Sequence, residues 1–125
     1  MKAFGELIYS PERASGEALS KVESHTPKIT APESVRAGEP FEVEIKVGPH
    51  PNTEQHSIRR IEVYFYEEGR PFNPILVTSI DLAPVYAEPV LKMTLKLSRS
   101  GTIYAVEYCN LHGLWEAGRE VRVTA

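Results

Sequence analysis

The residues of this 125-residue chain that are best able to do chemistry are its four histidines and its single cysteine. Cys109 and His112 form a Cys-x-x-His pair, a spacing that allows a thiolate and an imidazole to face one ion. His50 and His56 flank a Pro-Asn turn that can return the chain toward the same point. His25 lies just before the first predicted strand. Together these side chains predict a metal site, although each histidine alone is more simply a surface loop residue and the cysteine a small buried one.

The number of candidate ligands bears on which metal the site takes. A closed zinc site needs four ligands, and five candidates are one too many for a tetrahedral arrangement. Four imidazoles and a thiolate are better suited to a single iron with an open sixth position. A cupredoxin-like copper electron carrier is an alternative, with two histidines, a cysteine and an axial methionine. Met93, however, precedes Cys109 instead of following His112, and two histidines would have no role.

Bringing these distant loops together requires a scaffold, and the sequence after Pro27 predicts one made of strands. Phe41, Val43, Ile45 and Val47 alternate with charged residues, which is typical of a strand with one buried face. Comparable patterns separated by turn residues predict seven strands, over residues 28–31, 41–47, 61–65, 75–82, 91–97, 103–108 and 121–123. This spacing predicts an all-β fold, a seven-stranded antiparallel immunoglobulin-like β-sandwich. Because a sandwich gathers its loops at its two ends, the candidate ligands can converge there.

The chain divides into two parts by pattern. Residues 1–24 are predicted to be an N-terminal extension, and residues 25–125 an immunoglobulin-like iron-binding domain. Pro11 and Gly16 argue against one long helix in the extension, although a short helix near residues 17–22 fits the sequence.

Composition excludes several classes of function. Hydrophobic residues make up 42% of the chain, which is enough for a packed core. The net charge of -3 and the lack of a basic cluster argue against nucleic acid as a partner. No apolar run approaches the ~20 residues of a membrane span, and no signal peptide is evident at the N-terminus. We therefore expect a cytoplasmic protein, where reducing conditions suit a lone functional thiol.

Three segments resemble a known protein family, the superoxide reductases of the neelaredoxin and desulfoferrodoxin group. They are residues 49–56, residues 85–89 and residues 108–116, the last of which contains Tyr108-Cys109-Asn110-Leu111-His112-Gly113. The resemblance covers roughly residues 23–116, and the two segments that carry histidines are long and specific. No cysteine-rich desulforedoxin-like segment precedes the sandwich, so the chain resembles the one-iron type.

The resemblance implies both the metal centre and the reaction. It implies a square-pyramidal Fe2+/Fe3+ centre with Cys109 axial and the four histidines in the plane, and it implies that Glu23 binds the ferric iron as a sixth ligand. It further implies that superoxide is reduced by one electron to hydrogen peroxide, after which rubredoxin or a similar carrier reduces the iron again. Members of this type are often homo-oligomers, so we expect a tetramer.

Two departures from the family pattern affect these expectations. The family often has a lysine, which attracts superoxide, directly before the first ligand histidine, and this chain has Ser24 there. Lys21 and Lys28 lie nearby in sequence and are interpreted as ordinary solvated lysines. An iron-binding family member with little turnover is therefore an alternative function. The loop before Val85 is also shorter than in relatives, which affects the expected oligomer contacts.

Overall fold

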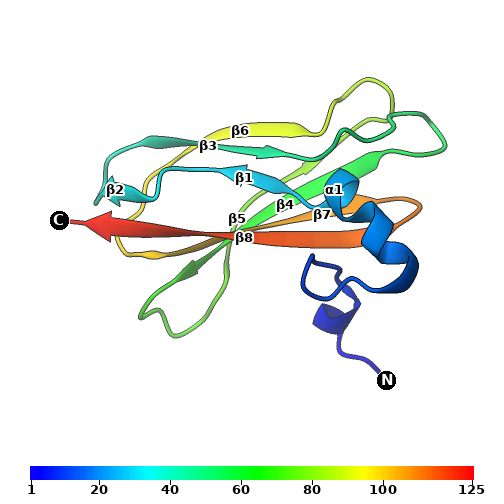
Figure 1. The fold of residues 1–125 in the computed structure, drawn as a ribbon. Coiled ribbons are helices and arrows are strands. Elements are labelled where there is room, and N and C mark those ends of the chain that lie inside the picture. Colours follow the sequence, from blue (N-terminus) through cyan, green and yellow to red (C-terminus); the bar gives the residue numbers. More distant parts are fainter.

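The computed structural model describes all of residues 1–125 and consists mainly of strands (Figure 1). The N-terminal part holds two 3₁₀ helices, Phe4–Leu7 and Gly16–Lys21, followed by the one-turn helix α1, Val22–His25. Eight strands follow: β1 (Lys28–Thr30), β2 (Ser34–Arg36), β3 (Phe41–Lys46), β4 (Ile58–Glu67), β5 (Ile75–Asp81), β6 (Val90–Leu95), β7 (Gly101–Cys109) and β8 (Gly113–Thr124). None of the helices is long and apolar enough to span a membrane.

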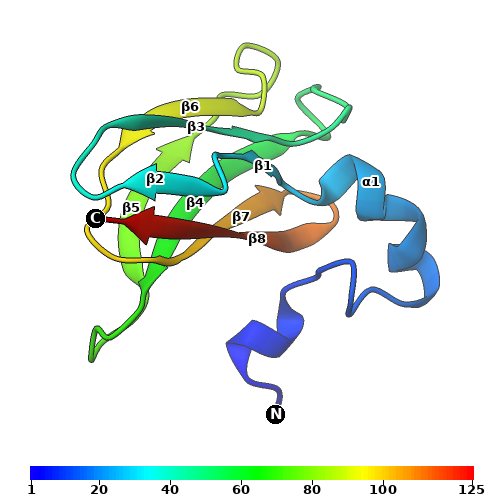
Figure 2. The same cartoon turned by 60° about the vertical axis from the view of Figure 1, so that its left-hand side comes forward.

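The strands form two sheets that pack face to face. The smaller sheet has the order β1-β3-β6, and the larger one has the order β2-β8-β7-β4-β5. Figures 1 and 2 show the smaller sheet lying over the larger one, with residues 1–24 outside the sandwich beside β8. Every strand pair is antiparallel except β2 with β8. The predicted all-β sandwich is therefore confirmed.

The structure has one strand more than the seven predicted. The additional strand, β2, is only three residues long and pairs in parallel with the end of β8. Three residues are too few to show an alternation, so the pattern gave no signal for β2. Strand β8 also begins at Gly113, eight residues before the predicted segment. Its first half alternates weakly, because only Trp115 is fully buried there, and cross-strand pairing with β7 extends the strand.

The inward faces of both sheets form a single apolar core. The side chains of Ile45, Ile61, Val63, Ile103 and Ala105 are 0% exposed and pack in this core. Burial of such a side chain stabilises the fold by about 1.5–3 kcal/mol for the larger residues. The same core cluster contains the cysteine at the end of β7. The scaffold thus continues directly into the candidate site.

Candidate metal centre

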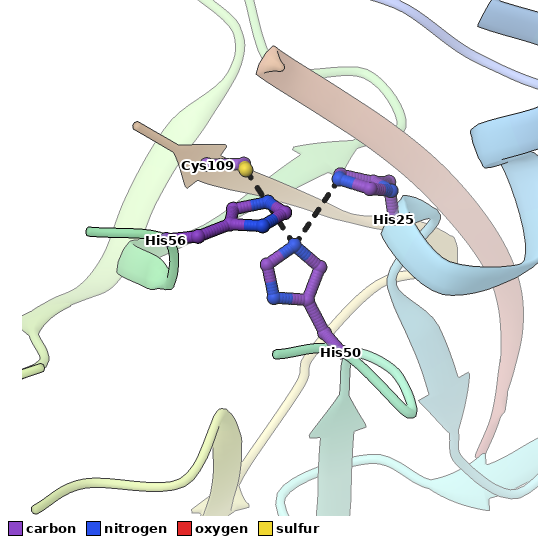
Figure 3. Close-up of side chains that lie close together, drawn as sticks. All are labelled: His25, His50, His56 and Cys109. Atoms are coloured by element: carbon purple, nitrogen blue, oxygen red, sulfur yellow. Dashed lines mark hydrogen bonds between the residues drawn. The ribbon is translucent and has the colours of Figure 1, made fainter. Parts of the chain in front are cut away.

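All four histidines and Cys109 meet at one end of the sandwich, and Figure 3 shows four of these five side chains. His25 ends α1, and His50 and His56 lie in the loop between β3 and β4. Cys109 is the last residue of β7, and His112 lies in the tight turn to β8. One ligand atom from each of His25, His50, His56 and Cys109 lies within 4.8 Å of the other three. The sandwich therefore gathers at one point residues that are up to 87 positions apart in sequence.

Two glycines allow these loops to turn as sharply as they do. Gly48 has a φ of 117°, and a Cβ atom there would lie 2.7 Å from the backbone nitrogen of His50. Gly113 has a φ of 81° and closes the turn after His112. Residues with a side chain rarely adopt this backbone region. The two glycines therefore help to aim His50 and His112 at the same point.

The four imidazoles are arranged in a closed ring, in which each imidazole lies next to two others. Their centroids are 4.6 Å apart for His25–His50, 4.6 Å for His50–His56, 5.0 Å for His56–His112 and 4.9 Å for His25–His112. The diagonal pair His25–His56 is 6.4 Å apart. Nε2 of His25 lies 3.1 Å from Nε2 of His50 and 3.2 Å from Nδ1 of His112. Two nitrogens bound at right angles to one ion at about 2.1 Å would lie about 3.0 Å apart, so this spacing fits a shared ion.

Hydrogen bonds outside the ring of histidines decide which nitrogens are free to bind a metal. Nδ1 of His25 lies 3.0 Å from the carbonyl oxygen of Lys21, and Nδ1 of His50 lies 2.6 Å from that of Pro51. A carbonyl only accepts, so each Nδ1 donates and each neutral ring leaves a lone pair on its inward Nε2. Two lone pairs cannot form a hydrogen bond with each other, whereas a cation between them satisfies both. Nε2 of His56 is also buried without a partner, which fits the same interpretation.

Electrostatics keep these histidines neutral and therefore able to bind a metal. Burial, together with the neighbouring His50, lowers the pKa of His25 to about 4, although the bond to the Lys21 carbonyl opposes this shift. Burial also lowers the pKa of His50 and of His56. Neutral imidazole is the form that binds metals, so no proton has to leave these rings near neutral pH.

Cys109 lies beside the closed ring of four imidazoles and is fully buried. Its Sγ atom is 3.5 Å from Nε2 of His50 and 3.8 Å from Nδ1 of His112. Burial raises the pKa of the thiol, while backbone N–H groups of Leu111 and His112 lower it. A coordinated metal deprotonates a thiol outright, and these two N–H donors favour the resulting thiolate.

Glu23, Lys21 and Lys28 lie outside the cluster of four histidines and Cys109. Glu23 is exposed on α1 and makes no hydrogen bond or ion pair with the cluster. Ser24 Oγ lies 2.7 Å from Nδ1 of His25, on the outer side of that ring. Lys28 donates from Nζ to the carbonyl oxygen of Gly48 at 2.7 Å, so it is held by the loop and not freely solvated. The charge of Lys21 helps to lower the pKa of His56, so it acts at the site.

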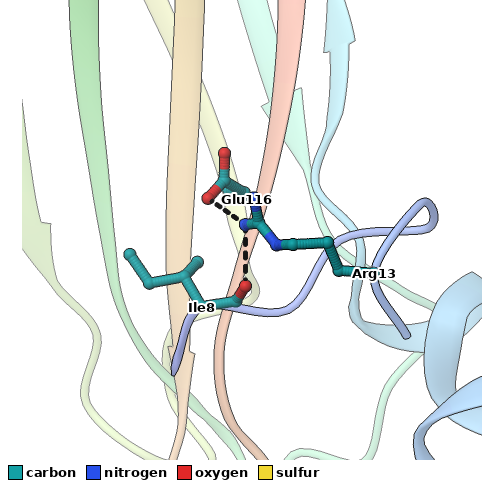
Figure 4. A network of polar contacts seen from close by, with 3 residues as sticks. All are labelled: Ile8, Arg13 and Glu116. Atoms are coloured by element: carbon teal, nitrogen blue, oxygen red, sulfur yellow. Dashed lines mark hydrogen bonds and ion pairs between the residues drawn. The ribbon is translucent and has the colours of Figure 1, made fainter. Parts of the chain in front are cut away.

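Trp115 packs directly against the candidate centre. Its ring centroid lies 5.3 Å from that of His25, and its Nε1 donates to the carbonyl oxygen of His112 at 3.0 Å. The ring of Tyr9 stacks on that of Trp115, with centroids 4.9 Å apart. Figure 4 shows how Arg13 fastens this segment, because its guanidinium donates to both Ile8 and Glu116. The N-terminal extension therefore covers one flank of the site.

Two further residues that bear on the site were missed by the sequence analysis. Asn110 accepts from the backbone nitrogen of Ser57 at 2.9 Å and donates to the carbonyl oxygen of Gln55 at 2.9 Å. It thereby ties the loop of His56 to the Cys-x-x-His turn. Glu107 is 0% exposed on the inner face of β7, and neither carboxyl oxygen has a partner. Burial raises its pKa to about 9, so it is neutral at pH 7.

Comparison with known proteins identifies the family to which this chain belongs. The desulfoferrodoxin family matches residues 17–118. A putative superoxide reductase from Thermotoga maritima is 40% identical over 117 residues, which cover 82% of this chain and 89% of that protein. The superoxide reductase of Pyrococcus furiosus is 41% identical over 110 residues, covering 77% and 86% of the two chains. The solved structure of superoxide reductase (neelaredoxin) from Ignicoccus hospitalis is 63% identical, with a TM-score of 0.93 over 98% of this chain and 100% of that one. From its fold, its cluster of histidines and cysteine, and these matches, the chain belongs to the desulfoferrodoxin family.

Proposed function

We propose that this protein is a superoxide reductase with one mononuclear non-haem iron per chain. In this reaction one superoxide, one electron and two protons give one hydrogen peroxide, and no O2 is released. The observation that carries the proposal is the closed ring of four imidazoles with the Cys109 sulfur beside it. The names of the relatives from Thermotoga maritima and Pyrococcus furiosus support the choice of superoxide as substrate.

The residues that would hold the iron are His25, His50, His56, His112 and Cys109. Four imidazoles and one thiolate match the ligand preference of iron and leave one coordination position for the substrate. When bound, the iron supplies the single electron that superoxide takes up. Glu23 is the proposed additional ligand of the ferric form. Its exposed position on α1 means that α1 or its side chain has to move for that role.

The residues around the site orient the histidine rings, exclude water and attract an anionic substrate. The carbonyl oxygens of Lys21 and Pro51 fix the tautomer and direction of two histidine rings. Trp115 is 1% exposed and excludes water from the face of the His25 ring that it covers. The positive charge of Lys21, which contributes to the lowered pKa of His56, would attract an anion to this end of the sandwich.

The proposal extends to partners and location. Each turnover consumes one electron, so we propose rubredoxin or a similar one-electron carrier as the donor. We also propose a homotetramer, and a reducing compartment such as the cytoplasm, because the one cysteine is free and buried.

Two other functions are alternatives to this proposal, and the experiment described below distinguishes them from it. An iron-binding protein with little turnover is motivated by Ser24, which stands where relatives often have a lysine. A copper carrier is disfavoured because all four histidines converge, whereas such a site uses two. Met93, its candidate axial ligand, lies on β6 and pairs with Val43 instead of joining the cluster.

Metal analysis combined with product analysis tests the proposed function. The protein is loaded anaerobically with Fe2+, desalted and supplied with superoxide and a reduced rubredoxin. We expect one iron per chain, one hydrogen peroxide per superoxide consumed, and no O2 beyond that from spontaneous dismutation. Copper or zinc bound in preference to iron, or O2 released in step with hydrogen peroxide, would contradict the proposal.

A further inference from the structure

We propose that Asn52 is a positioning residue of the metal centre. Its side-chain amide fastens the loop that carries His50 and His56 to the segment between β5 and β6. This inference rests on the proposed centre, because it concerns how two of the candidate ligands are held. The sequence places Asn52 in the Pro-Asn turn two residues after His50, but it gives no role to the side chain of Asn52.

The side-chain amide of Asn52 contacts three residues between β5 and β6, namely Val85, Ala87 and Glu88. Its Oδ1 accepts from the backbone nitrogen of Val85 at 2.7 Å. Its Nδ2 lies 3.3 Å from the carbonyl oxygen of Val85, 3.4 Å from that of Ala87 and 3.5 Å from Oε2 of Glu88. The bond to the Val85 nitrogen is the shortest of the four. Asn52 therefore uses both its acceptor and its donor on the same short stretch of chain.

Val85 is the residue on which this attachment depends. Its φ is 75°, and it is the only residue other than glycine with a positive φ. A β-branched side chain is strongly disfavoured in this region, so the conformation persists only when the surroundings hold it. Val85 is also exposed, so burial of its side chain does not hold it. Two hydrogen bonds hold it instead: Ala87 N–H donates to the carbonyl oxygen of Ala83 across the turn, and Val85 N–H donates to Asn52.

The loop of His50 and His56 is held mainly by hydrogen bonds, among them those of Lys28 to the Gly48 carbonyl and of Arg59 to the Glu54 carbonyl. Pro51 and residues 53–55 are exposed, so the loop has almost no apolar packing of its own. Asn110 braces the end near His56 through Gln55 and Ser57. Asn52 braces the other end, close to His50. Loss of Asn52 should therefore free His50 more than His56 and weaken a metal that needs both.

Cobalt binding by the purified protein tests this role. We expect Asn52→Ala to bind Co2+ about 10- to 100-fold more weakly than the wild type, the usual cost of removing a residue that orients a ligand. The Co2+–thiolate absorption bands should also shift, because the ligand geometry changes. Asn73→Ala is the matched control, since Asn73 makes comparable amide bonds to the backbone of Glu67 and Arg70. It lies at the other end of β4, about 30 Å away, and should leave Co2+ affinity unchanged.

A second variant and a metal-free measurement separate positioning from a general loss of stability. Asn52→Asp keeps the acceptor for the Val85 N–H group but loses the donors and adds a charge near Glu88. It should bind Co2+ with an affinity between those of the wild type and Asn52→Ala. In the metal-free protein, Asn52→Ala should speed hydrogen exchange at the Val85 amide at least about tenfold, while exchange in β4 and β7 stays slow.

The possible results distinguish failure of this inference from failure of the proposed centre. Equal Co2+ affinity in the wild type and Asn52→Ala would overturn the role of Asn52 and leave the centre intact. So would an equal loss in Asn73→Ala, because destabilisation alone would then explain the effect. An Asn52→Asp variant as weak as Asn52→Ala would overturn the role of the Val85 bond. Failure of the wild type to bind Co2+ at all would instead contradict the proposed centre.

Discussion

His25 and His50 each have their outer ring nitrogen bound to a backbone carbonyl, one to Lys21 and the other to Pro51. These bonds leave the inner nitrogens unprotonated and aimed at one point before any metal arrives. Ligands that are already oriented lose less conformational freedom on binding, which favours metal affinity. The chain itself thus prepares the site at the level of single atoms.

The thiolate gives the first prediction. Cys109→Ser should keep the fold, because the change is nearly isosteric within the core. It should abolish the visible charge-transfer band of the ferric protein and most of the superoxide reduction, because oxygen donates less electron density to iron than sulfur does. Circular dichroism, absorption spectra and superoxide consumption by the iron-loaded variant provide the check. A variant that retained both colour and rate would show that Cys109 is not a ligand.

The second prediction concerns the positive charge near the site. A unit charge about 6 Å from the substrate contributes about 3 kcal/mol at an effective dielectric constant of 20. We expect Ser24→Lys to raise the second-order rate several-fold at low ionic strength and to steepen its fall with added salt. Lys21→Met should lower the rate, because the charge of Lys21 already acts near His56.

Lys96→Met is the matched control for these charge variants, since Lys96 is exposed just beyond β6, at the end of the sandwich away from the histidines. It changes the net charge as Lys21→Met does. If Lys96→Met lowered the rate as much as Lys21→Met, net charge alone would explain the effect. If Ser24→Lys changed neither rate nor salt dependence, the weakened electrostatic attraction proposed for Ser24 would be wrong.

Glu23 gives the third prediction. Glu23→Ala should leave the reaction of the ferrous protein with superoxide nearly unchanged, because the substrate needs the open position. It should alter the absorption spectrum of the resting ferric form, because ferric iron favours a hard anionic oxygen ligand. Spectra recorded across a pH range check this role. A ferric spectrum identical to that of the wild type would contradict it.

At the scale of secondary-structure elements, alternation predicted β3 to β7 well, but it missed most of β8, the longest strand. β3 was predicted almost to the residue, because its inner and outer faces differ sharply in polarity. β2 and the first eight residues of β8 were missed, since their pairing depends on neighbouring strands and not on local pattern. Glu107 was detectable in principle, because it is a charged residue at an inward-facing position between Ala105 and Cys109.

Strand β7 gives the fourth prediction, through the buried carboxyl of Glu107. Its pKa is raised by burial from 4.5 to about 9, so the folded state keeps a proton that the unfolded state releases between these values. The contribution of Glu107 to the free energy of unfolding therefore falls as the pH rises from 4.5 to about 9. Glu107→Gln cannot ionise and should become more stable relative to the wild type by roughly 1 kcal/mol per pH unit.

Urea unfolding of the metal-free proteins at pH 5 and pH 8 measures this difference. The advantage of Glu107→Gln should be larger at pH 8. An advantage that is the same at both pH values would mean that Glu107 is not a buried neutral acid in the folded state.

At the scale of the whole molecule, the fold explains why ligands from four segments can share one point. α1, the β3–β4 loop, the end of β7 and the β7–β8 turn all lie at the same end of the sandwich (Figure 1). The sequence could predict the five candidate ligands by their residue types and loop positions. It could not predict the order of the rings, the tautomers or the two asparagine braces, because these depend on contacts between segments distant in the chain.

Pulse radiolysis of the iron-loaded ferrous protein is the measurement that tests the central claim most directly. It generates a known amount of superoxide and follows both its decay and the oxidation of the iron. We expect second-order decay at about 10⁸–10⁹ M⁻¹s⁻¹, close to the limit for an electrostatically assisted encounter. Without an electron donor, consumption should stop after one superoxide per iron. Decay no faster than in buffer, or continued consumption far beyond one superoxide per iron, would contradict the assignment as a superoxide reductase.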